Sequence, residues 1–123
     1  MNELIKQRLD NAASTIDSLY DASDEIETIA NHIIHAFTNG GTLFVAGNGG
    51  SAAQSIHLCE ELTGRYRDSR PALPALCLCS DAAAMSCIAN DFGWEEVFKR
   101  QIEAHATCVV NEHDEATCHD VLL

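Results

Sequence analysis

The residue order around position 47 restricts the fold of this chain more than any other stretch. An apolar run with β-branched and aromatic residues, 43–46 (LFVA), stops at residues 47–51 (GNGGS). This order is typical of a buried strand that ends in a turn where the backbone needs positive φ or approaches a ligand closely. Ser51 stands where a helix N-cap belongs, and the free N–H groups of a first helical turn favour phosphate. A purely structural turn explains the glycines equally well. The run also lacks the lysine of a P-loop and the spacing of a dinucleotide fingerprint, which would favour phosphate binding.

A histidine and a carboxylate follow the turn at helical spacing. If a helix runs from residue 52 to about residue 65, His57 and Glu61 lie four residues apart on one face. Imidazole and carboxylate together suit zinc. A solvated surface pair is the alternative, and the neighbouring glycine turn favours the functional interpretation. The sequence therefore predicts an anion site at the glycine turn and a metal ligand or base on the helix that follows it.

The composition limits the class of protein. A chain of 123 residues with 46% hydrophobic residues is one domain at most, with a modest core. Its net charge of −12 argues against a nucleic-acid-binding face. With no leader and no long apolar span, we expect a soluble intracellular chain without membrane contact. In such a chain we expect Cys59, Cys77, Cys79 and Cys87, which fall in apolar patterns, to be reduced core residues.

The N-terminal part predicts two helices. Apolar residues recur at helical spacing over residues 5–19 and again over residues 26–37. Ser23 or Asp24 can cap the second helix, and residues 39–41 (NGG) end it.

The part after the predicted site helix alternates strand and helix. Residues 75–79 are apolar enough for a buried strand, and Ser80 or Asp81 caps a helix over residues 82–89. The sequence NDFG breaks this helix, and residues 94–104 form another. Strands separated by helices predict an α/β fold with a parallel sheet.

Two runs carry a resemblance to a known family. They are GNGGSAAQSIHLCEELTGRYRDSRPALPALCL and CIANDFGWEEVFKRQIEA. The chain resembles the phosphoheptose isomerases of the sugar isomerase (SIS) family over about residues 1–104. The resemblance implies an α/β, SIS-like (flavodoxin-like) parallel sheet flanked by helices. It implies a single partial SIS domain over residues 1–123, with N-terminal helices over 1–40, the phosphate loop and site over 41–104, and a divergent tail over 105–123.

The same resemblance implies an activity. Members of the family convert sedoheptulose 7-phosphate to D-glycero-D-manno-heptose 7-phosphate, an aldose–ketose isomerisation for lipopolysaccharide and related surface glycans. It further implies a cytoplasmic homotetramer with zinc at each site. One alternative is a non-catalytic relative, like the SIS proteins that bind a replication initiator, although the presence of both His57 and Glu61 argues against it. Another is a chain that only binds sugar phosphate.

The resemblance also assigns roles to residues. His57 and Glu61 match zinc ligands, and Glu61 is in addition the implied catalytic base. Arg65 either contacts the substrate or merely ends its helix. The implied substrate contacts are Asn48, Gly49, Gly50, Ser51, Glu61, Arg65, Asn90 and Asp91.

The C-terminal residues depart from the family pattern. Family members continue into a serine-rich phosphate loop and a helix with a glutamine and a histidine, whereas this chain stops at DVLL. We therefore expect a sheet truncated after its third strand and an isolated chain without appreciable isomerase turnover. Residues 109–118 look inserted, and Cys108, His113, Cys118 and His119 match no strong zinc pattern.

Overall fold

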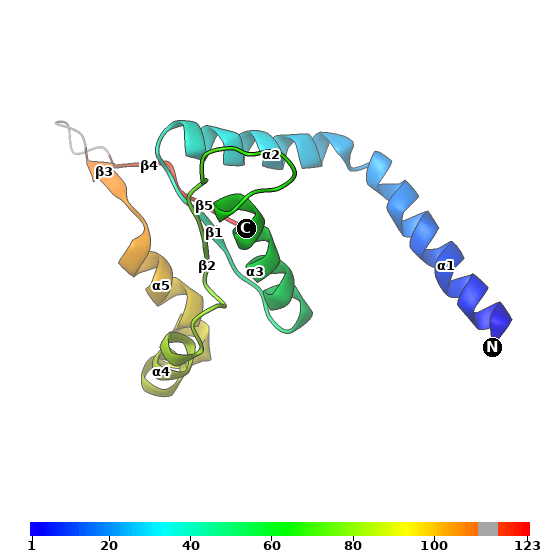
Figure 1. The fold of residues 1–123 in the computed structure, drawn as a ribbon. Coiled ribbons are helices and arrows are strands. Elements are labelled where there is room, and N and C mark those ends of the chain that lie inside the picture. Colours follow the sequence, from blue (N-terminus) through cyan, green and yellow to red (C-terminus); the bar gives the residue numbers. More distant parts are fainter. Residues whose placement is uncertain (111–115) are drawn as a thin grey trace. The chain divides into compact units, whose positions relative to one another are not determined.

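The computed structural model describes residues 1–110 and 116–123 (Figure 1). The chain divides into two compact units, residues 1–32 and 33–123, and each is described by itself. Among the described helices, none combines the length and the apolar composition that crossing a membrane requires.

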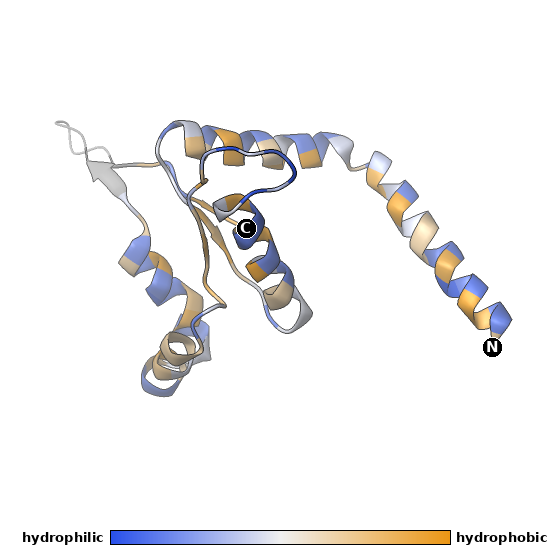
Figure 2. Ribbon diagram, in the orientation of Figure 1, coloured by the Kyte–Doolittle hydropathy of each residue, from blue (hydrophilic) through white to orange (hydrophobic). Residues whose placement is uncertain are grey.

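Helices form the first unit. α1 (Asn2–Asp17) is followed by a short 3-10 helix (Ser18–Tyr20) and by α2 (Ser23–Thr38), whose last turns belong to the second unit. Both predicted N-terminal helices are confirmed. Apolar bands alternate with polar ones along α1 (Figure 2), and Leu9 and Ile16 each keep 64% of their surface exposed. The helical periodicity of this unit therefore produces an apolar face that the unit itself leaves uncovered.

Three parallel strands form the centre of the second unit, in the order β2-β1-β5. They are β1 (Leu43–Val45), β2 (Ala75–Cys77) and β5 (Val121–Leu122). The predicted parallel sheet is confirmed. All of β1 is buried because it is the central strand, whereas Leu76 in β2 keeps 37% of its surface exposed. The strand predicted over residues 75–79 is therefore shorter and less buried than expected.

α4 (Ala82–Phe92) packs on α5 (Val97–His105) across a short 3-10 helix (Trp94–Glu96). Asp81 caps α4 as predicted, because its carboxylate accepts the amides of the second and third helical residues at 2.9 and 3.0 Å. The predicted break at NDFG is confirmed, although α4 runs three residues beyond residue 89 and ends at Phe92. Its C-cap is Gly93, whose φ of 98° favours glycine.

Cys59, Cys77, Cys79 and Cys87 form no disulfide, as predicted. Cys59 and Cys77 are buried and Cys79 is half-buried. The predicted core position of Cys87 is wrong, since this residue is exposed on α4, where its thiol lies 3.7 Å from a carboxylate oxygen of Asp91.

The C-terminal residues add a hairpin and an anchor. β3 (Cys108–Val110) runs antiparallel to β4 (Ala116–Cys118), so the stretch that looks inserted begins and ends in paired strands. The Asp120 carboxylate then accepts hydrogen bonds from the amides of Thr42 and Thr107, both at 2.7 Å. This carboxylate ties the chain after the hairpin to the start of β1.

Candidate functional site

The glycine turn connects β1 to α3 (Gly50–Thr63) and places the helix against the sheet. The predicted N-cap role of Ser51 is wrong, because the N-cap is Gly49 with a φ of 57°, a conformation that serine adopts poorly. Gly47 is needed for another reason. A Cβ at this position would lie 2.8 Å from two atoms of Ser51. The two glycines let α3 begin close to β1, so the first amides of the helix lie at the turn itself, where the Ser51 amide donates to the Asn48 carbonyl at 3.1 Å.

Cys79 holds this turn from the end of β2. Its Sγ accepts a hydrogen bond from the Gly47 amide at 3.1 Å and donates one to the Gly47 carbonyl at 3.0 Å. Burial raises the pKa of the Cys79 thiol, so the sulfur keeps the proton that it donates. Local sequence carries no signal for this contact, because only the pairing of β1 with β2 brings the two residues together.

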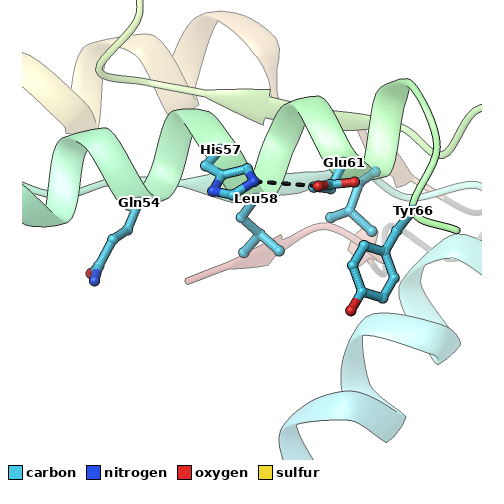
Figure 3. Close-up of a pocket in the computed structure, with 6 residues that line it drawn as sticks. Gln54, His57, Leu58, Glu61 and Tyr66 are labelled. Atoms are coloured by element: carbon cyan, nitrogen blue, oxygen red, sulfur yellow. Dashed lines mark hydrogen bonds and ion pairs between the residues drawn. The ribbon is translucent and has the colours of Figure 1, made fainter.

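His57 and Glu61 lie together on one face of α3, as the spacing predicts (Figure 3). His57 Nε2 and Glu61 Oε1 are 3.3 Å apart, and the two side chains are 69% and 32% exposed. Two ligand atoms of a tetrahedral zinc ion lie about 3.3 Å from each other. The pair therefore has the spacing of two metal ligands as well as that of a hydrogen bond.

The structure gathers no third metal ligand at this pair. Within residues 1–110 and 116–123, no group of three or more His, Cys, Asp or Glu side chains has the arrangement of a metal site. Of the cysteines and histidines in the C-terminal tail, His113 lies outside the described residues. His119 instead places its ring edge-on to His35, with the ring centroids 6.1 Å apart.

An open cavity of about 450 Å³ follows this face of α3. Its lining combines polar and apolar side chains, namely Gln54, His57, Leu58, Glu61, Leu62 and Tyr66 (Figure 3). A smaller cavity of about 220 Å³ includes Ser51 in its wall and shares Gln54 and Leu58 with the first. The glycine turn and the His57–Glu61 pair therefore belong to one continuous face.

Sequence reasoning missed several residues of this face. Gln54, Leu58 and Leu62 repeat every four residues along α3, a helical spacing that places them on one side together with His57 and Glu61. Tyr66 carries no such signal, because it follows the end of the helix.

The predicted substrate contacts Asn90, Asp91 and Arg65 are not brought to this face. Asn90 and Asp91 are exposed in the last turn of α4, where Asn90 Nδ2 donates to Asp91 Oδ1 at 2.8 Å. Arg65 is exposed just beyond the end of α3. The two cavities along α3 are lined by other residues, so the substrate roles of these three side chains stay predictions.

Known proteins share both the sequence and the fold. Phosphoheptose isomerases of Sodalis glossinidius and Serratia proteamaculans are 44% and 43% identical to this chain over 107 and 106 residues, which are 83% and 84% of the chain. Each alignment covers 54% of the relative, so the chain spans about half the length of the curated relatives it matches.

Solved structures give the same result. The chain is similar to phosphoheptose isomerases from Neisseria gonorrhoeae and Francisella tularensis, with TM-scores of 0.61 and 0.66 and sequence identities of 26% and 27%. These alignments cover 96% and 93% of this chain and 58% and 59% of the solved chains. A family model described as SIS domain matches residues 8–114. The chain therefore belongs to the SIS domain family.

Proposed function

We propose that this chain supplies the substrate loop, the catalytic base and two metal ligands of an isomerase that converts sedoheptulose 7-phosphate to D-glycero-D-manno-heptose 7-phosphate. One observation carries the proposal: His57 and Glu61 lie 3.3 Å apart in the wall of a cavity that shares two lining residues with a second cavity, whose wall includes Ser51 of the glycine turn. The names of the curated relatives support the class of reaction. The same resemblance is the reason for proposing a cytoplasmic reaction that serves lipopolysaccharide heptose synthesis.

In our proposal the sugar phosphate lies along α3. With a rise of about 1.5 Å per residue, His57 lies about 9 Å and Glu61 about 15 Å along the helix from Ser51. In our proposal the phosphate binds the amides at the start of α3, which carry the positive end of the helix dipole. The reacting carbons then lie near His57, and the Glu61 carboxylate reaches back toward them because side chains on a helix lean toward its N-terminus.

The reaction needs a base near these carbons. An aldose and a ketose interconvert when a proton moves between C1 and C2 through an enediol. Glu61 is the proposed base, because its carboxylate lines the cavity and is 32% exposed. In this role Glu61 removes the proton from one carbon and returns it to the other, while the glycine turn holds the phosphate end of the substrate in place.

His57 and Glu61 also fit zinc. Their donor atoms are of the right kind, and the 3.3 Å separation of Nε2 and Oε1 matches that of two ligands on a tetrahedral ion. Bound there, zinc supplies an electrophile for the sugar's carbonyl oxygen. Two protein ligands make a weak, open site.

A zinc titration tests this assignment. His57→Ala is expected to abolish specific zinc uptake, whereas Cys118→Ser is expected to leave it unchanged. The reverse pattern would move the metal site to the C-terminal tail.

Binding and turnover of sedoheptulose 7-phosphate test the proposed function. Calorimetry is expected to show that the 123-residue chain binds it and that Glu61→Gln binds it less tightly. We propose that turnover by this chain alone is negligible, because one absent acid/base group costs about 10²- to 10⁴-fold in rate. Absence of binding by the wild-type chain contradicts the proposed substrate. Robust turnover that disappears in Glu61→Gln contradicts our view that further groups of the family pattern are needed.

The apolar face of α1 and the resemblance to the family lead us to propose a homotetramer. Sedimentation at micromolar concentration tests it, and a well-folded monomer contradicts it.

A further inference from the structure

A single side chain holds the C-terminal end of α3. Arg70, which is half-buried, donates from Nη2 to the Glu61 carbonyl at 2.6 Å and from Nη1 to the Leu62 carbonyl at 2.8 Å. A third hydrogen bond joins Nη1 to the Pro71 carbonyl at 2.9 Å. The last carbonyls of a helix have no partner within the helix, so Arg70 satisfies two groups that the helix leaves open.

A guanidinium is well suited to this place. The C-terminal end of a helix carries partial negative charge, and a charged donor bonds carbonyls more strongly than a neutral one. The planar fork of arginine reaches two carbonyls at once, which the single ammonium of lysine does not reproduce. Backbone amides complete the arrangement, with Gly64 donating to Glu60 at 2.7 Å and Leu73 to Leu62 at 3.1 Å.

The loop that Arg70 closes forms one end of the cavity. Tyr66 lines the cavity beyond Glu61 (Figure 3). Next to it, Arg67 has a φ of 60° and is the only non-glycine residue with positive φ in the described part of the chain. Its guanidinium carbon lies 5.0 Å from the centroid of the Tyr66 ring. Such a backbone persists only where its surroundings fix it, and Arg70 joins this loop to the helix.

We propose that Arg70 is a positioning residue for the candidate site. It fixes the backbone of Glu61 and closes the loop that carries Tyr66, and thereby keeps Glu61 Oε1 beside His57 Nε2 in the cavity wall. Arg70 acts through the Glu61 carbonyl and does not itself contact the substrate. The chemical purpose of this positioning rests on the proposed function, whereas the contact between Arg70 and α3 does not.

Zinc binding by the full chain tests the proposal. Arg70→Met is expected to weaken zinc affinity about 10- to 100-fold, the usual effect of removing a group that orients a metal ligand. Arg70→Lys is expected to restore only part of this loss. Arg67→Gln is the matched control, because it removes the same charge from the same loop without removing a bond to a helix carbonyl, and its affinity is expected to stay close to that of the wild type. All titrations are made well below the lowest melting temperature of the set.

Amide hydrogen exchange at residues 61–64 gives a second readout. Arg70→Met is expected to speed exchange in this last turn, and Arg67→Gln is not. Faster exchange with unchanged zinc affinity overturns the positioning role and leaves only a structural one. Unchanged exchange in Arg70→Met overturns the inference altogether. If the wild-type chain binds no zinc, the proposed metal site fails, and the exchange comparison alone then decides whether Arg70 holds Glu61.

Discussion

Alanine substitutions in the glycine turn test whether Gly47 is needed because a side chain there would collide with Ser51, or only because glycine makes the backbone flexible. In Gly47→Ala the new Cβ lies 2.8 Å from the carbonyl carbon and the Cβ of Ser51, well inside the 3.4 Å at which ordinary contacts begin. The first turn of α3 must therefore move away from β1 by several tenths of an ångström. Strain of this kind costs about 1–3 kcal/mol. Gly50→Ala is the matched control, because its Cβ meets no atom within 4 Å and gains up to about 1 kcal/mol of helix propensity.

Urea unfolding distinguishes the two variants. Gly47→Ala is expected to lower the free energy of unfolding by about 1–3 kcal/mol, whereas Gly50→Ala leaves it unchanged or raises it. Titration with inorganic phosphate adds a functional readout, since the displaced first turn is expected to weaken phosphate binding in Gly47→Ala. Equal stability of the two variants refutes the reasoning, because the contact between residues 47 and 51 would then impose no constraint.

Three further substitutions test other contacts. Burial is the main cause, and the neighbouring Cys77 the second, that raises the pKa of the Cys59 thiol from 9.0 to about 11. The protonated thiol therefore contributes its full stabilisation of the folded state below pH 9, and this stabilisation is lost between pH 9 and 11. Cys59→Ala is expected to flatten this part of the pH dependence of urea unfolding; an unchanged slope contradicts the assignment. Asp81→Ala removes the cap of α4 and is expected to cost about 1 kcal/mol in urea unfolding, and no change would mean that the cap contributes nothing. Asp120→Ala removes two charge-assisted bonds and is expected to cost about 1.5–3 kcal/mol, with thermal unfolding as the check; an unaltered midpoint rules out this role.

The elements and contacts that the sequence predicts correctly depend on residues that lie close together in the chain. The run 43–46 predicts β1 because consecutive apolar residues need burial on both faces, and the central strand provides it. His57 and Glu61 were placed together because helical geometry alone brings residues four apart onto one face. Asp81 was predicted as a cap for a similar reason, since its partners are the next few amides.

The contacts that sequence reasoning missed join distant residues. Arg70 bonds helix carbonyls eight and nine positions earlier, and the Cys79 thiol bonds a residue thirty-two positions earlier. No periodicity records such pairs, because the path of the backbone decides them. Ser51 failed as a cap for a subtler reason. A preceding glycine with positive φ let the helix start sooner, so the better capping residue was not used.

The pairing of β5 with β1 has a consequence for synthesis on the ribosome. The Ala46 amide, just before the glycine turn, bonds the Leu123 carbonyl at 2.9 Å, and the Leu123 amide bonds the Phe44 carbonyl at 2.8 Å. The turn thus receives one of its anchors only after nearly eighty further residues have been added. Until then Leu43 and Phe44 lack a neighbour on one side and remain available to chaperones. The glycine turn is therefore expected to become fully ordered only after β5 has been synthesised.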